Sequence, residues 1–181
     1  TTGASNTALG SAALGANTTA SNNTAVGLSA LTANTTGSEN VAVGRLALQS
    51  NTTASDNTAL GNGTLLANTT GTSNTAVGAA ALLANTTASG ITAVGYYALA
   101  SNTTGVSNTA LGYQSLTTNT TGDRSVAVGS YALDAQTTGR FNTAVGYNAG
   151  TEVTTGTHNT FIGDSSGATT TTGINNVAVG Q

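Results

Sequence analysis

Apolar and polar side chains alternate over short segments that recur along the whole chain. In Asn23-Thr24-Ala25-Val26-Gly27 and its counterparts the alternation has a period of two residues, which is typical of a β-strand. The closing glycine returns every 17 residues without insertion or deletion, and a repeat of this length is too short for a helical pair, which needs roughly 33 residues. We therefore predict an all-β protein, a β-solenoid or β-roll of about ten to eleven 17-residue coils stacked in register. The glycines are Gly10, Gly27, Gly44, Gly61, Gly78, Gly95, Gly112, Gly129, Gly146, Gly163 and Gly180.

Each repeat is numbered here from its glycine, so that Gly27 stands at position 1 and Val43 at position 17 of the same repeat. Position 15 is Thr or Val, position 17 is Val, Leu or Ile, and position 5 is Leu in eight of ten repeats. Because strand residues alternate between two faces, we expect positions 15 and 17 to point into the coil with the leucines. Positions 14 and 16 are then expected to point outward. Gly or Ala at position 11 predicts a second corner with a tight or left-handed backbone.

The composition agrees with stacked coils. The 181 residues include 39 Thr, 20 Asn and 24 Gly, and only 5% are charged. A charged residue repeated in every coil would face like charges about 4.8 Å away on both sides, and each such pair costs about 1 kcal/mol even in water. Asparagine can instead form ladders of amide hydrogen bonds, which we expect at positions 8 and 14. The low charge is therefore interpreted as a consequence of the fold, and not as a sign of disorder.

Several classes of site are excluded by residue type. The chain has no Cys, which excludes disulfides and thiolate metal sites, and its three Arg without any Lys exclude a basic nucleic-acid surface. No apolar run approaches the roughly 18 residues of a membrane span. We expect no cofactor, no nucleic-acid partner and no membrane insertion.

Position 16 is Ala in ten of eleven repeats, with Phe161 as the exception. An outward position that stays small indicates close packing against another copy of the chain around a symmetry axis. The alternative is that Ala merely suits a tight turn. The alanines expected at this contact are Ala25, Ala42, Ala59, Ala76, Ala93, Ala110, Ala127 and Ala144.

Five tyrosines gather at positions 2 and 3 of four successive repeats, and such amphipathic rings suit contact with a glycan or a host-surface protein. Alternatively they shield that corner or pack against a neighbouring chain. These residues are Tyr96, Tyr97, Tyr113, Tyr131 and Tyr147.

Charged side chains are scattered, and no catalytic arrangement can be assembled from them. His158 is the sole imidazole and is expected to be solvated. Glu39 and Asp56 stack one coil apart and should repel mildly or hold a cation, although two carboxylates are fewer than calcium prefers. Asp123 and Arg140 should form an exposed ion pair worth at most about 1 kcal/mol.

The Asn-Thr-Thr triplets at positions 8 to 10 match the acceptor motif for N-glycosylation. Seven of them fall in one stacked column, which favours a buried Asn ladder over seven glycosylation sites.

The segments Ser73-Asn74-Thr75-Ala76-Val77-Gly78 and Asp123-Arg124-Ser125-Val126-Ala127-Val128-Gly129 resemble the head repeats of trimeric autotransporter adhesins. Those repeats read roughly Asn-Ser-Val-Ala-Ile-Gly, and similar ones occur in bacterial surface fibres and phage tail-fibre-like proteins. The resemblance covers essentially the whole chain and implies a left-handed β-roll in which three chains pack in parallel. The adhesin unit is a few residues shorter, so the extra length here must enlarge a corner or a side.

We expect residues 1–181 to form a single repeat array from a longer fibre, with 147–181 as variant coils of the same solenoid. The leading hypothesis is a non-enzymatic structural and adhesive segment of an extracellular, cell-surface or virion fibre. The alternative is an ice-binding solenoid that uses its Thr columns, although the adjacent Thr35 and Thr36 cannot both face outward from a strand. A polysaccharide-degrading enzyme is disfavoured because no carboxylate cluster recurs.

Overall fold

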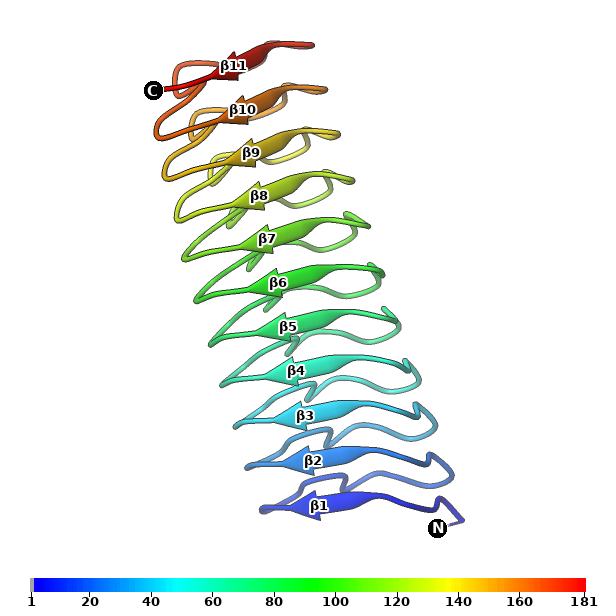
Figure 1. The fold of residues 1–181 in the computed structure, drawn as a ribbon. Helices are drawn as coiled ribbons and strands as arrows, with labels where there is room; N and C mark the ends of the chain where they lie inside the picture. The colour runs from blue at the N-terminus through cyan, green and yellow to red at the C-terminus, as the bar shows by residue number, and fades with distance from the viewer. Residues whose placement is uncertain (1) are drawn as a thin grey trace.

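The computed structural model describes residues 2–181, which wind into a rod of stacked coils with one short strand per coil (Figure 1). The strands pair in chain order as one parallel sheet, and equivalent residues such as Thr75 and Thr92 lie opposite each other. No helix occurs within residues 2–181. The predicted β-solenoid with its 17-residue register is therefore confirmed. The strands are β1 (Thr7–Leu9), β2 (Thr24–Val26), β3 (Val41–Val43), β4 (Thr58–Leu60), β5 (Thr75–Val77), β6 (Thr92–Val94), β7 (Thr109–Leu111), β8 (Val126–Val128), β9 (Thr143–Val145), β10 (Thr160–Ile162) and β11 (Val177–Val179).

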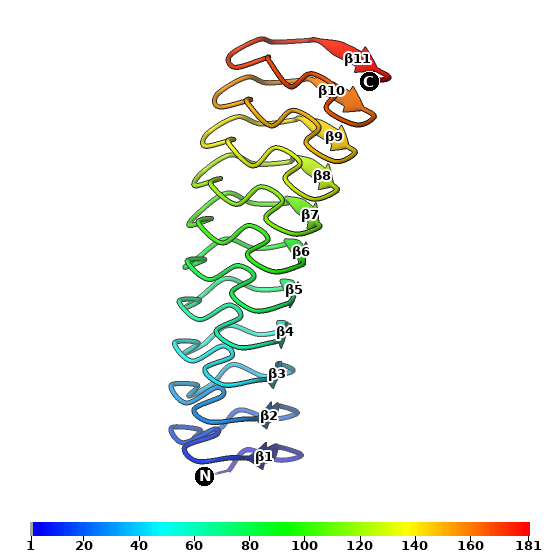
Figure 2. The same ribbon diagram turned by 90° about the vertical axis from the view of Figure 1, so that its left-hand side faces the viewer.

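The coil is left-handed. In Figure 1 every strand runs leftward on the near side of the rod, and the chain returns on the far side while it rises toward the C-terminus. Figure 2, turned by 90°, places all strands along one edge and the turns across the rest of the coil. The sheet therefore forms one wall of the rod, and hydrogen-bonded turns form the others.

Backbone hydrogen bonds join neighbouring coils outside the strands as well. The Leu31 amide donates to the Ala47 carbonyl at 3.0 Å, and the Thr35 amide donates to the Thr52 carbonyl at 2.9 Å. Because the turns pair with the turns of the next coil, an inserted residue would leave buried amides without partners. This pairing explains why the period never varies.

The faces of the strands are the reverse of the prediction. Position 16 points into the coil, and positions 15 and 17 point outward, so the expected outward packing of the alanines is wrong. In β5, for example, Ala76 is fully buried between the exposed Thr75 and the half-buried Val77. The fully buried alanines are Ala25, Ala42, Ala59, Ala76, Ala93, Ala110, Ala127 and Ala144.

The narrow interior explains this reversal. The leucines of position 5 are buried, as predicted, and they belong to the same core cluster as the position 16 alanines. Phe161 replaces Ala at position 16, and it fills the room that leucines take elsewhere. A Cβ on Gly150 would lie 2.8 Å from Phe161, and a Cβ on Gly167 would lie 2.2 Å from it. A large side chain on one wall therefore requires a small one on the other.

Two asparagine ladders line the interior, which confirms that part of the prediction. At position 8, Asn68 donates to the Asn51 side chain at 3.0 Å and to the Gly71 carbonyl at 3.0 Å. At position 14, the Asn40 side chain accepts from the Asn57 backbone amide at 3.0 Å. Contrary to the prediction, position 14 faces inward, where its amides satisfy backbone groups that water cannot reach.

Left-handed backbone is concentrated at positions 3, 5 and 13, where φ lies near +50° to +60° in residues such as Leu31 and Glu39. Position 11 does not use left-handed backbone, and the bends beside it lie at positions 9, 10 and 13. The glycine of position 1 is required by close approach. Gly27 has φ of +134°, and a Cβ there would lie 2.5 Å from the carbonyl oxygen of Gly44.

The shared core volume around Phe161 yields a stability prediction. Phe161→Ala should lower the free energy of unfolding by about 3–5 kcal/mol because it leaves a cavity. Gly167→Leu should also destabilise the chain because the new side chain overlaps Phe161. The triple variant with Phe161→Ala, Gly150→Leu and Gly167→Leu restores the packing of other coils, and its urea midpoint should return close to that of the parent. Losses that simply add would contradict the shared volume.

Candidate functional site

The outward side chains of positions 15 and 17 form a continuous surface along all eleven strands, which we call the sheet face. It combines a row of Thr and Val with a row of Val, Leu and Ile, and neither row contains a charged residue. Several of its aliphatic side chains are well exposed, such as Leu60 and Leu111 at 46% each. With strands about 4.8 Å apart, the sheet face is about 48 Å long.

The tyrosines form one connected cluster, which we call the tyrosine strip. The rings of Tyr96 and Tyr97 lie 4.5 Å apart between centroids, and Tyr96 stacks on Tyr113 at 5.5 Å with an interplanar angle of 12°. Tyr131 meets Tyr113 at 5.3 Å and Tyr147 at 6.2 Å, both edge to face. The tyrosines lie in the turns that follow β6, β7, β8 and β9. The register thus brings together all five tyrosines.

The crowding of the strip changes the acidity of two phenols. Partial burial among the neighbouring rings, and then the proximity of the Tyr97 and Tyr113 phenols, raises the pKa of Tyr96. Partial burial and contact with Tyr113 likewise raise the pKa of Tyr131, with smaller contributions from Tyr147 and Asp134.

A second cluster, the charged corner, lies before β8, β9 and β10. Arg124 lies 3.5 Å from Asp123, and Arg140 lies 4.0 Å from the same carboxylate, which confirms the predicted Asp123–Arg140 pair. The guanidinium of Arg124 sits 5.5 Å from the Phe141 ring centre, and Phe141 stacks on His158 at 4.7 Å. His158 is exposed, and one of its ring faces is occupied by Phe141.

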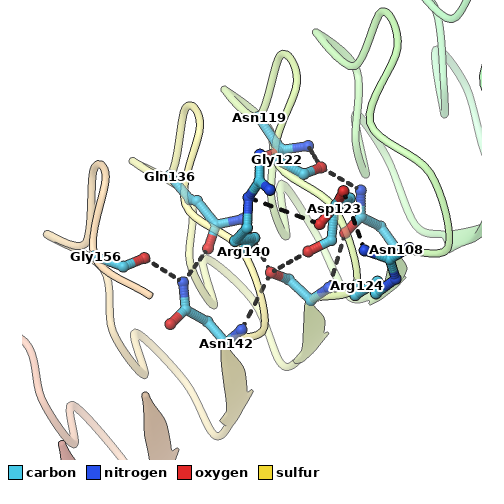
Figure 3. A network of polar contacts seen from close by, with 10 residues as sticks. Asn108, Asn119, Gly122, Asp123, Arg124, Gln136, Arg140, Asn142 and Gly156 are labelled. Carbon is cyan, nitrogen blue, oxygen red and sulfur yellow. Dashed lines mark hydrogen bonds and ion pairs between the residues drawn. The ribbon is translucent and has the colours of Figure 1, made fainter. Parts of the chain in front are cut away.

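Beneath the charged corner, two departures from the repeat compensate each other (Figure 3). Ser125 replaces Asn at position 14, and Gln136 replaces Asn at position 8 of the next coil. The longer Gln136 side chain donates to both Asn119 and Ser125 at 3.2 Å and accepts from Asn142 at 2.8 Å. Ser125 is too short to continue the position 14 ladder by itself. The extra methylene of Gln136 lets this side chain reach from the position 8 ladder to the position 14 ladder and close the gap.

The other candidate residues do not form a site. Glu39 and Asp56 lie exposed at neighbouring corners, and no group of three or more His, Cys, Asp or Glu within residues 2–181 can hold a metal. The Asn of the Asn-Thr-Thr triplets is buried from Asn34 to Asn119 and bonded in the ladder, which confirms the ladder interpretation. A hollow lies at each end of the stack, one lined by residues between Gly3 and Asn17 and the other by residues between Ser165 and Gln181.

Sequence reasoning found the Asp123–Arg140 pair but missed the rest of the charged corner and the sheet face. Arg124, Phe141 and His158 all stand at position 13, so the 17-residue register alone could have placed them in one column. The sheet face was missed because its residues were assigned to the interior. The uniform aliphatic character of position 17 is a signal of burial, but the single chain leaves these side chains partly or largely open to solvent.

Comparisons with protein-family models, curated proteins and solved structures find no match to this chain. Within residues 2–181, no helix has the length and apolar character needed to cross a membrane.

The raised pKa values of the Tyr96 and Tyr131 phenols predict a late stage in the tyrosine titration. In the folded protein, Tyr96 and Tyr131 should ionise at higher pH than in the urea-unfolded chain, as followed by ultraviolet absorbance. Their preference for the protonated form favours the folded state below pH about 10, and this contribution is lost as the pH rises through the raised pKa. Tyr96→Phe should remove part of the late stage. A single transition that coincides with the unfolded chain would contradict the crowded strip.

Proposed function

We propose that the chain is a structural and adhesive segment of an extracellular, cell-surface or virion fibre, and that it associates with copies of itself through the sheet face. The observation that carries the proposal is the uninterrupted, uncharged row of aliphatic side chains at position 17. Monomeric proteins rarely leave apolar patches of more than a few hundred Å² in water. A surface about 48 Å long with an aliphatic residue on every strand is therefore a candidate interface.

The thin interior supports association. Each coil with Leu at position 5 buries that leucine and one to three alanines beside its asparagine amides. Covering the sheet face would bury a further Val, Leu or Ile side chain per coil, and full burial of such a side chain stabilises by about 1.5–3 kcal/mol. The outer rows, and not the alanines, therefore offer the apolar area that an assembly needs.

The constant period favours a closed, parallel assembly. Copies aligned side by side meet with the same spacing along their whole length, and a rotation axis parallel to the rod gives every copy the same environment. The left-handed coil is also compatible with the resemblance to trimeric adhesin heads (Figure 1). So are the strands of sequence Thr-Ala-Val, in which the first and third side chains face outward. We therefore propose three parallel chains. The tyrosine strip and the charged corner lie at opposite ends of the strands, on the two edges of this interface.

Charges introduced into the sheet face should dissociate the assembly. Val77→Glu with Val94→Glu places two carboxylates in neighbouring coils of the sheet face, where association would desolvate them. The parent chain should sediment as a trimer at micromolar concentration, and this variant should shift to the monomer. Thr70→Glu with Thr87→Glu is the matched control, because it introduces the same pair in an exposed column away from the sheet, and it should remain trimeric. A parent chain that sediments as a monomer would refute the proposal.

One observation favours a second function, ice binding. Because positions 15 and 17 face outward, eight of the eleven strands present a Thr-x-Val, Thr-x-Leu or Thr-x-Ile pair on one sheet. This array replaces the adjacent threonines considered from the sequence, of which Thr35 donates its hydroxyl to the Thr52 carbonyl at 3.0 Å. Val41, Val126 and Val177 interrupt the hydroxyl row, and Leu or Ile replaces Val in every third strand of the other row. These irregularities favour self-association over a match to a crystal lattice.

Thermal hysteresis separates the two functions. If the sheet face is an interface between copies, the parent chain should show no hysteresis, because the face is covered. If it binds ice, a monomeric chain should show hysteresis that Thr75→Tyr reduces and the matched control Thr70→Tyr leaves unchanged. Hysteresis from a monomer would replace the fibre proposal with the second function.

A further inference from the structure

We propose that the tyrosine strip binds a neutral, linear polysaccharide that lies along the rod. This inference specifies the adhesive part of the proposed function and rests on it, but it does not require association through the sheet face. Tyr96, Tyr113 and Tyr147 are 47%, 42% and 53% exposed. Tyr131 contacts both Tyr113 and Tyr147, and Tyr97 lies against Tyr96. The five rings form one surface over four successive coils.

The strip is unlike the surface that in-register copies would share. Such an interface repeats in every coil, as the sheet face does. The tyrosines, in contrast, are confined to the coils after β6 to β9, and the same columns elsewhere hold unrelated residues such as Ser11, Arg45 and Asn62. A cluster confined to four coils fits a ligand of limited contact length better than a second copy of the rod.

The chemistry of the strip favours a neutral sugar chain. Because Tyr96 stacks on Tyr113, the strip offers the C–H groups of a pyranose only those apolar faces and edges that the rings leave uncovered. Its phenols can exchange hydrogen bonds with the sugar hydroxyls. The charged groups beside the strip are carboxylates, with Asp134 near Tyr131 and Asp164 in the coil after Tyr147. Anionic polymers would be repelled there, whereas neutral ones would not.

The geometry favours an extended ligand parallel to the rod. Four coils span about 14 Å along the axis, so the rings succeed one another at intervals close to the length of one pyranose unit. Tyrosine has few rotatable bonds, and the ring contacts within the strip restrict them further, so little entropy is lost on binding. A proline-rich peptide would also meet aromatic rings, but it is usually held in a groove. The hollows at the two ends of the rod are lined by other residues and include no tyrosine.

Tyrosine fluorescence gives a direct test, because the chain has no Trp and all five tyrosines belong to the strip. The parent protein would be titrated with hexasaccharides of β-linked glucose, mannose, xylose and N-acetylglucosamine, and with heparin and poly-L-proline for comparison. At least one neutral hexasaccharide should change the fluorescence saturably, with heat of binding measured in parallel. Heparin should have no effect.

Two variants and a control locate the site. Tyr113→Ala and Tyr147→Ala should each weaken the affinity by about tenfold. Leu28→Ala, which removes an exposed apolar side chain from the same column outside the strip, should bind like the parent. Circular dichroism establishes that each variant is folded. If Tyr113→Ala loses its fold, Tyr147→Ala decides the question.

Several outcomes would overturn the inference. These are no response to any neutral hexasaccharide, unchanged affinity in the folded tyrosine variants, or saturable binding of poly-L-proline or heparin in place of the sugars. The Val77→Glu and Val94→Glu variant separates this inference from the proposed association. It should keep its sugar affinity even as a monomer, so a failure of the fibre assembly and a failure of the sugar site are told apart.

Discussion

The constraint on which this structure depends is the exact stacking of one coil on the next. Backbone amides in the strand and in the turns pair with carbonyls of neighbouring coils, and buried asparagines bond to their own counterparts. Every residue therefore has an equivalent directly above and below it. This explains the unbroken period, because a single insertion would leave buried polar groups without hydrogen-bond partners. It also explains the scarcity of charge, because a charged column would repel itself along the rod.

The second constraint is the width of the interior. One leucine from the turns and one alanine from the strand fill most of it, and Phe161 shows that this volume is shared, since Gly150 and Gly167 replace the leucines around it. The larger strand residues are consequently displaced to the outside. The same limit that keeps the core small thus creates the exposed aliphatic sheet face, so that the packing inside the chain and the interface that we propose for this face have one physical origin.

Variation is confined to places where stacking does not restrict side chains. The corners at positions 2, 3, 12 and 13 carry the tyrosine strip and the charged corner, while positions 8, 14 and 16 scarcely change. Even a departure inside the coil is compensated, as Gln136 bridges to Ser125. The rod therefore behaves as a uniform scaffold whose corners can be altered coil by coil. Function is expected where side chains are exposed on a rigid framework.

The amino-acid sequence by itself determined the features that depend only on which residues repeat at 17-residue intervals. These are the period, the strand type, the buried leucines, the asparagine ladders and the Asp123–Arg140 pair. The inward face of the strands did not. Alternation shows which residues share a face but treats the two faces alike, and exchanging them moves every strand side chain to the other side. The folded chain decided that question through the volume left beside the leucines, which admits Ala76 but not Val77. The register places Arg124, Phe141 and His158 in one column, but only the folded chain shows how the guanidinium and the two rings pack against one another.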